Sequence, residues 1–457
     1  MNKYWKLISN TLIFAIGTFS SKVLVFFLMP LYTSVLSEAE YGTVDLMVQI
    51  GNFLLPLVSC GIINGIIRFG LDKYYKKKDV FTTGFVTILG GFGVLLLLEP
   101  LLSRLPYMGE NTLLIYIFVL MSSLRSLCSQ FVRAKGYVKL YSLDGLLSTA
   151  TTIFFNVLYL VVLKWGINGY ILAMVSADTL STIFLFYIAG LRRYLHLRGL
   201  NRRTSKEMLR YSIPLIPNSI FWWVNNMASR YLIAFFLGEE LNGLFAVSNK
   251  IPTVIVLMSN IFMDAWQMSA ITETQGRGSF FTRVFRSYTS LLFITGSGII
   301  LFSKVITKLL VSEAFYPSWQ YIPFLVMATV FTCIVNFLGS VYMVEKKSML
   351  SLATTAVGAV TNVILNFLLI PRFGVNGAAF ATFISYFVVF LLRAVDTRRF
   401  VRMRYSGLRL AINTILLLLQ SFVMILELPY WIAWEIGLTL LMIVTNLGGI
   451  VMTLQKL

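Results

Sequence analysis

The stretch RRYLHLRGLNRRTSKEMLRYSIPLIP, residues Arg192–Pro217, contains seven basic residues and a single acid, Glu207. Long apolar runs flank this stretch on both sides. A basic stretch can bind nucleic acid, but one placed directly between two apolar runs is typical of a loop on the cytoplasmic side of a membrane. We therefore interpret it as a cytoplasmic hinge that joins two homologous membrane halves.

The composition supports a membrane location for the whole chain. Of its 457 residues, 58% are hydrophobic and 12% are charged, whereas a soluble domain has about 25% charged residues. The net charge of +19 is explained by cytoplasmic loops rich in Lys and Arg, so we expect membrane lipids and not nucleic acid as partners. The three cysteines are far apart and there is one histidine, so we expect no metal site and no cofactor.

The apolar runs predict an all-α polytopic membrane protein with about 14 transmembrane helices, at about 20 residues per helix. The first run is too long for a signal peptide, and we expect it to be retained as a helix. Most of the basic residues lie in alternate loops, so the positive-inside rule places both termini in the cytoplasm. The predicted helices cover residues 7–30, 41–67, 81–102, 113–132, 141–163, 169–191, 212–237, 244–271, 284–311, 321–344, 350–370, 377–395, 408–426 and 431–454.

Two sequence motifs occur twice. LSEAEYG at 36–42 is similar to LGEELNG at 237–243, and WGINGYILAMVSADT at 165–179 is similar to FGVNGAAFATFISYF at 373–387. Both pairs are about 200 residues apart, which is the length of six helices with their loops. Because six is an even number, both copies start on the same side of the membrane, and the repeat is parallel.

The repeat predicts an N-terminal six-helix lobe at 1–200, a C-terminal six-helix lobe at 201–405 and an additional helix pair, helices 13 and 14, at 406–457. Two parallel halves imply a cavity at their interface near the middle of the membrane, and alternating access by rocking of the halves. The alternative is a repeat that only builds a membrane scaffold.

Charged and polar residues inside the predicted helices are the candidates for a site. A charge near the bilayer centre costs about 2.5–3.5 kcal/mol, so such residues usually face a cavity or a partner. Deep within the predicted membrane helices, cations outnumber acids, which favours an anionic ligand. The amide and hydroxyl side chains there suit a sugar. The candidate cations are Lys22, Arg230, Lys250, Arg125 and Arg68. The candidate polar residues are Thr18, Gln49, Asn52, Asn226, Thr253 and Asn260, and the candidate ion-coupling acids are Asp178 and Asp264.

Several of these residues have a simpler explanation. Arg68 lies at the cytoplasmic end of its predicted helix, where a long side chain can reach the membrane surface without binding a ligand. Arg125 can pair with Asp178 or Asp144 in its own half and be purely structural. No P-loop and no nucleophile-plus-base pattern is present in the sequence, so we do not expect an enzyme.

The segments PLYTSVLSEAEYGTVDLM at 30–47 and PRFGVNGAAFAT at 371–382, with the six-plus-six-plus-two layout, resemble the polysaccharide transporters of the multidrug/oligosaccharidyl-lipid/polysaccharide exporter superfamily. The resemblance spans the chain and implies a MATE-like flippase fold. It implies translocation of an undecaprenyl-pyrophosphate-linked oligosaccharide to the outer leaflet of the bacterial cytoplasmic membrane, through a cationic central cavity. A polysaccharide polymerase and glycosyltransferases are the implied protein partners.

Three other functions remain open. A lipid II flippase resembles this chain in helix number and in its cationic cavity. A cation-coupled drug antiporter of the same superfamily usually has carboxylates in the first half, and the first helix here carries Lys22 and no acid. A membrane scaffold without transport activity is the alternative from a different class.

Overall fold

The computed structural model describes residues 28–104, 109–196, 200–272, 277–345, 347–401, 403 and 406–454. Every regular element in these ranges is helical, and eleven helical runs among them are long and apolar enough to cross a membrane. One run, 349–399, contains two helices that meet at Gly374, where φ is 59° and ψ is −143°. The all-α polytopic fold is therefore confirmed, and the runs are compatible with about 14 helices. Most of the predicted helix 7–30 lies outside the described residues.

The chain divides into two compact units, and the boundary lies between Trp223 and Val224. The three-part division at 200 and 405 follows the sequence repeat and stays a prediction. A π-helical segment, Val157–Val162, continues α8 in the first unit. Before the boundary the helices are α2 (Met29–Val35), α3 (Glu38–Val58), α4 (Ile62–Leu71), α5 (Lys77–Leu97), α6 (Glu99–Leu102), α7 (Thr112–Ala134), α8 (Val138–Asn156), α9 (Gly166–Ile188), α10 (Arg202–Ser212) and the first part of α11 (Ile216–Leu237).

The second unit begins within α11 and contains a further eight helices among the described residues. The helices after α11 are α12 (Glu239–Ser248), α13 (Thr253–Thr272), α14 (Arg277–Leu301), α15 (Ser303–Leu310), α16 (Ile322–Val344), α17 (Ser348–Asp396), α18 (Gly407–Ile425) and α19 (Trp431–Leu454). Helix α17 is the run that bends at Gly374.

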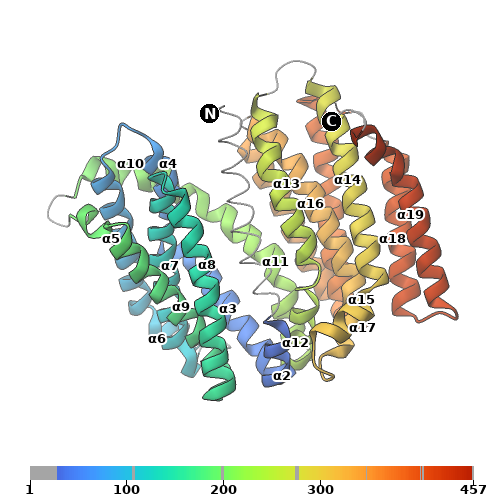
Figure 1. Cartoon of the computed structure of the whole chain (residues 1–457), viewed down its shortest axis with the longest axis horizontal. Coiled ribbons are helices and arrows are strands. Elements are labelled where there is room, and N and C mark those ends of the chain that lie inside the picture. Colours follow the sequence, from blue (N-terminus) through green and yellow to red (C-terminus); the bar gives the residue numbers. More distant parts are fainter. Residues whose placement is uncertain are drawn as a thin grey trace. The chain divides into compact units, whose positions relative to one another are not determined.

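In the first unit, α3, α5, α7 and α9 pack side by side, with α8 against α9 (Figure 1). Helix α3 starts at a capping box, because Ser37 and Glu40 each accept a hydrogen bond from the backbone N–H of the other. The predicted single helix over 41–67 is wrong in detail. It is broken at Cys60 and Gly61, where φ is 48° and 64°, and it restarts as α4.

The predicted hinge loop contains a helix, α10, that belongs to the core of the first unit. Met208 is fully buried and packs with Ile66 of α4 and Phe81 of α5, while most of the basic residues of α10 are exposed. The Tyr75 hydroxyl donates a hydrogen bond of 2.7 Å to Glu207. This bond, and next the bond from Arg203, lowers the pKa of the Glu207 carboxyl. The hinge is thus fixed to the first unit instead of forming a free loop.

The second unit holds a buried arginine. Arg393 lies near the end of the predicted helix 377–395, and in the structure it lies inside α17 and is 2% exposed. Its guanidinium donates to the Val335 carbonyl oxygen at 2.9 Å and to the Thr354 hydroxyl at 3.0 Å. Gly339 of α16 makes room for it, since a Cβ there would lie 2.6 Å from the guanidinium.

Gly339→Ala is therefore expected to lower the free energy of unfolding by about 1–3 kcal/mol, because the methyl group overpacks the site of Arg393. Gly298→Ala is the matched control, because a Cβ at this helical position meets nothing within 4 Å. Thermal unfolding of the two purified variants measures the difference. Equal melting temperatures for both variants would show that the guanidinium moves aside without cost.

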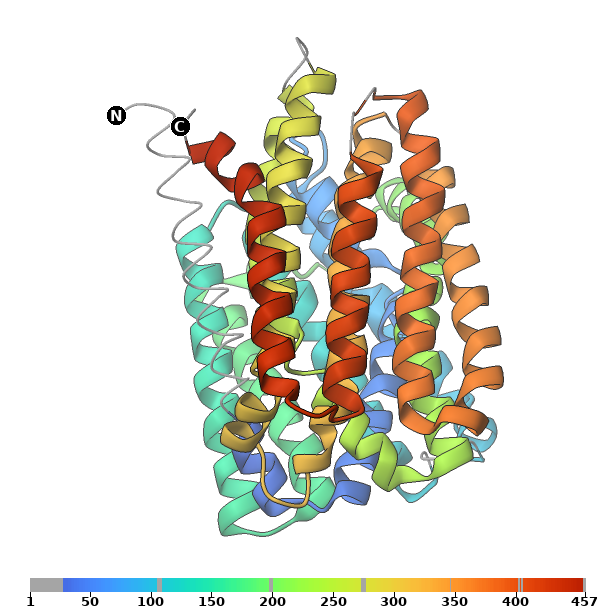
Figure 2. The same ribbon diagram turned by 90° about the vertical axis from the view of Figure 1, so that its right-hand side faces the viewer.

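Helices α18 and α19 form an antiparallel pair in the second unit, and both pack against α14 (Figure 2). At one end, Lys304 of α15 pairs with Glu427 in the turn of this pair. The same ammonium group lies 4.2 Å from the ring centres of Trp319 and Trp431. This arrangement fixes the turn to the rest of the second unit.

Candidate functional site

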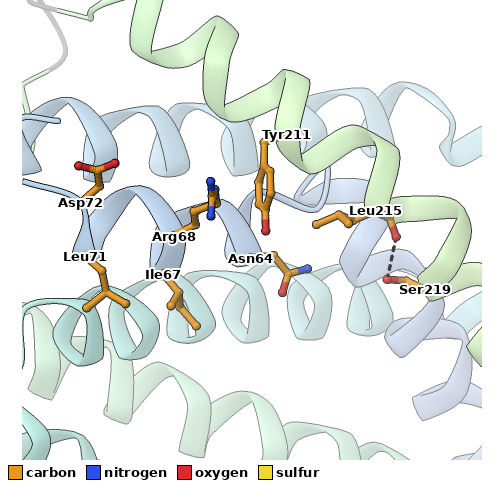
Figure 3. A pocket seen from close by; sticks show the side chains of 8 residues that line it. All are labelled: Asn64, Ile67, Arg68, Leu71, Asp72, Tyr211, Leu215 and Ser219. Atoms are coloured by element: carbon orange, nitrogen blue, oxygen red, sulfur yellow. Dashed lines mark hydrogen bonds between the residues drawn. The ribbon is translucent and has the colours of Figure 1, made fainter. Parts of the chain in front are cut away.

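A pocket of about 750 Å³ opens in the first unit between α4 and the segment from α10 to α11 (Figure 3). Next to the pocket the two segments approach each other closely at a glycine of α4, since a Cβ at Gly65 would lie 2.7 Å from the Ser212 hydroxyl. The break before α4 is also in contact, since a Cβ at Gly61 would lie 2.8 Å from the Ser212 carbonyl oxygen. The pocket is lined by Asn64, Ile67, Arg68, Leu71, Asp72, Tyr211, Leu215 and Ser219.

Arg68, one of the predicted cations, is the charged centre of this pocket. Its guanidinium carbon lies 5.3 Å from the centre of the Tyr211 ring, and the residue is exposed. A contact with a ring face uses none of the five N–H donors of the guanidinium. Within the described part of the chain no carboxylate forms an ion pair with Arg68. Its donors are therefore available to an anion.

Of the other polar groups of the pocket, Asp72 is a carboxylate and the rest are neutral. Ser219 donates a hydrogen bond to the Leu215 carbonyl oxygen at 3.4 Å, as Figure 3 shows. Asp72 accepts a hydrogen bond from the backbone N–H of Tyr74 at 2.9 Å, which orders the turn after α4. Asn64 lies one helical turn before Arg68 and adds an amide donor and acceptor. Phosphate and carboxylate groups suit such a set, because they take charge-assisted bonds from arginine.

Arg125 lies in a second polar cluster of the first unit, between α7, α8 and α9. It donates to Asp178 at 3.0 Å and lies 3.9 Å from Asp144, so it pairs with both acids that the sequence offered as its partners. Ser122 donates to Asp178 and Ser181 donates to Asp144. One arginine thus faces two acids. The ligand role of Arg125 and the coupling role of Asp178 stay predictions.

Arg230 and Lys250 lie in the second unit. Arg230 is 8% exposed on α11, next to a polar seam in which Ser229 contacts Thr382 at 3.1 Å and accepts a hydrogen bond from Asn366 at 3.0 Å. Lys250 is half-buried in the break between α12 and α13, so the predicted single helix over 244–271 is wrong in detail. The hydroxyl of Thr253 donates to the Lys250 carbonyl oxygen and caps this break.

The remaining predicted polar residues are not gathered in one place within the described structure. The Gln49 carbonyl oxygen accepts a hydrogen bond from the indole of Trp223 at 2.9 Å, and its side chain accepts one from Asn52 at 3.2 Å. Asn260 is exposed on α13. Two of the predicted residues, Thr18 and Lys22, lie outside the described residues. For Asn226 and Asp264 the structure describes the helix but not the side chain.

Sequence reasoning missed several residues that share these sites. Tyr211, Asn64 and Ser219 line the pocket of Arg68, although Tyr211 belongs to the stretch that we interpreted as a hinge. Asn366 and Thr382 lie in the polar seam of the second unit. An isolated amide or hydroxyl inside an apolar run was the available signal, but the register between helices that brings them together cannot be seen in one sequence.

Comparisons with known proteins identify a family from the sequence and a fold from solved structures. Residues 33–322 match the family model described as polysaccharide biosynthesis protein. The chain matches none of the curated proteins with which it was compared. Among solved structures it is similar to lipid II flippase MurJ in an inward closed conformation, with a TM-score of 0.72, 14% identity, and 95% of this chain and 98% of that chain covered.

A second similar structure is an inward-facing multidrug resistance MATE family transporter of the MOP superfamily. Its TM-score is 0.67 at 14% identity, and the match covers 84% of this chain and 98% of that chain. At these identities the likeness establishes the fold, while the family follows from the sequence match over more than half of the chain. The chain belongs to the polysaccharide biosynthesis protein family and is a multi-pass membrane protein with a MATE-like fold.

Proposed function

We propose that the protein is a flippase that moves an undecaprenyl-pyrophosphate-linked oligosaccharide repeat unit from the inner to the outer leaflet of the bacterial cytoplasmic membrane, for surface polysaccharide synthesis. The observation that carries this proposal is the family match over residues 33–322 in a chain with the fold of flippases and exporters. It is a transport function and not a catalytic one. Both termini lie in the cytoplasm, and the two lobes alternate in access to a cationic cavity.

The pocket around Arg68 is a structural observation that supports the proposal. Its lone cation, its amide and its hydroxyl match a pyrophosphate group joined to a sugar. On the proposed topology this end of α4 faces the cytoplasm, where the substrate is made. An inside-negative potential favours outward movement of a dianion by about 2.3 kcal/mol per charge per 100 mV, so the membrane potential can assist export.

The second candidate is a lipid II flippase, favoured by the TM-score of 0.72 and by the coverage of nearly the whole of both chains in the match to MurJ. Deletion of the gene in its host separates the two. The proposal expects loss of surface polysaccharide and accumulation of lipid-linked repeat units on the cytoplasmic leaflet, with normal peptidoglycan synthesis. Accumulated lipid II with unchanged surface polysaccharide would replace it with the second candidate.

The cations Lys22, Arg230 and Lys250 are proposed to hold the pyrophosphate in the cavity. Alanine at any one of these positions is expected to lower export about tenfold, the loss of one charge-assisted bond, with unchanged protein level. Arg230→Lys keeps a point charge but not the planar fork, so it should retain part of the activity. Cytoplasmic repeat units and surface polysaccharide are measured together. Wild-type export in all three alanine variants would assign the pyrophosphate to other residues.

A further inference from the structure

A buried acid lies in the helix pair that has no counterpart in the sequence repeat. Glu435 of α19 is 0% exposed, and so is Gln420 of α18, which donates a hydrogen bond of 3.0 Å to the Oε2 atom of Glu435. The same Gln420 amide donates to the Thr439 hydroxyl at 3.0 Å, and Ser297 of α14 donates to Thr439 at 3.2 Å. The acid is thus enclosed where α14, α18 and α19 meet.

Among the described residues no cation forms an ion pair with Glu435. The nearest charged pair along the chain is Lys304 with Glu427, which already neutralise each other. Arg286 and Arg409 lie about 16 Å along their helices from Ser297 and Gln420, respectively. The other charged residues of these three helices, Arg277 and Arg283, are farther still. An ionised carboxyl without a cation is very costly in such a place.

Two buried atoms in this cluster have no hydrogen-bond partner, and both are acceptors: Oε1 of Gln420 and Oε1 of Glu435. The two N–H donors of Gln420 are already used by Glu435 and Thr439. With an ionised acid, both Oε1 atoms stay unsatisfied. A proton on Oε1 of Glu435 adds one donor to this cluster, in which Oε1 of Gln420 is a buried acceptor without a partner.

We propose that Glu435 and Gln420 form a proton-binding site in the C-terminal helix pair, where Glu435 is held as the neutral acid while α19 is packed against α14 and α18. The proton can leave only if the packing opens and water reaches the carboxyl group. Docking of the helix pair is therefore linked to proton binding. Binding of this proton does not depend on the identity of the substrate.

Infrared difference spectroscopy of the purified full-length protein at neutral pH tests the proposal directly. The spectrum of wild type minus Glu435→Gln is expected to show the band of a protonated carboxyl group. Glu427→Gln is the matched control, since Glu427 is paired with Lys304 and 58% exposed in its side chain. Wild type minus Glu427→Gln should show only carboxylate bands. A carboxylate band in the Glu435 difference spectrum would overturn the proposal.

Stability provides a second readout. Glu435→Gln keeps a neutral group that has an acceptor oxygen and replaces the O–H donor with an NH₂ group, so it should fold and melt near the wild-type temperature. Glu435→Ala leaves Gln420 unsatisfied and should melt lower. Raising the pH should lower the melting temperature of wild type more than that of Glu435→Gln, because only wild type loses a proton. A Glu435→Gln protein that fails to fold, or that follows the wild-type pH profile, would contradict the site.

Discussion

Arg125→Ala is expected to lower the free energy of unfolding by about 3–5 kcal/mol and to deplete the folded protein in the membrane. The variant removes the cation that pairs with Asp178 at 3.0 Å and lies 3.9 Å from Asp144, and it leaves two acids between three helices. Asp144 has only 2% of its side chain exposed, so water cannot replace the guanidinium. The amount of monodisperse protein after extraction, and its melting temperature, measure the loss.

A neutral replacement of the whole cluster is the control. Arg125→Met combined with Asp144→Asn and Asp178→Asn removes all three charges, so no uncompensated charge is left between the helices. We expect this triple variant to recover most of the folded protein. An Arg125→Ala protein that is as abundant and as stable as wild type but does not export would contradict the structural role. It would assign Arg125 to the substrate, which is the other role that the sequence allowed.

The helical class and most of the spans could be predicted because hydrophobic runs of membrane length are a strong signal. The breaks within the predicted helices could not be predicted from the sequence. The break at Cys60 and Gly61 lies within one predicted helix, and the close packing of the Ser212 backbone against Gly61 is seen only in the structure. The helix α10 was hidden because its basic residues obscure the single buried face around Met208.

The site was predicted less completely, because a charge in a membrane helix indicates a partner without naming it. Arg68 and Arg125 were both candidates, yet the structure gives Arg125 two carboxylates and shows Arg68 against the ring of Tyr211. Glu435 was overlooked because it lies in the second turn of its helix, where an acid normally reaches water. Its full burial follows from packing against α14, which is far away in sequence.

Substitution of Arg68 is expected to have the largest effect on transport among the described pocket residues. Arg68→Ala should lower export about 10- to 100-fold, because a charge-assisted hydrogen bond to an anion contributes about 1.5–3 kcal/mol. Arg68→Lys should retain part of the rate, and Arg68→Glu should abolish it, since a carboxylate repels the pyrophosphate. The measurement is the fraction of lipid-linked repeat units on each leaflet, alongside surface polysaccharide.

The exposed cations of α10 are the matched control for Arg68. Arg202 and Arg203 lie in the same unit and carry the same charge, but they do not line the pocket, and Arg203 is paired with Glu207 at 3.1 Å. Replacing both with alanine should leave export largely intact, since pairs of this kind at the surface contribute little. Equal losses in the double variant and in Arg68→Ala would mean that net positive charge at this end of the unit drives transport. A loss confined to the Arg68 variants, with unchanged protein level, requires contact with the substrate in the pocket itself.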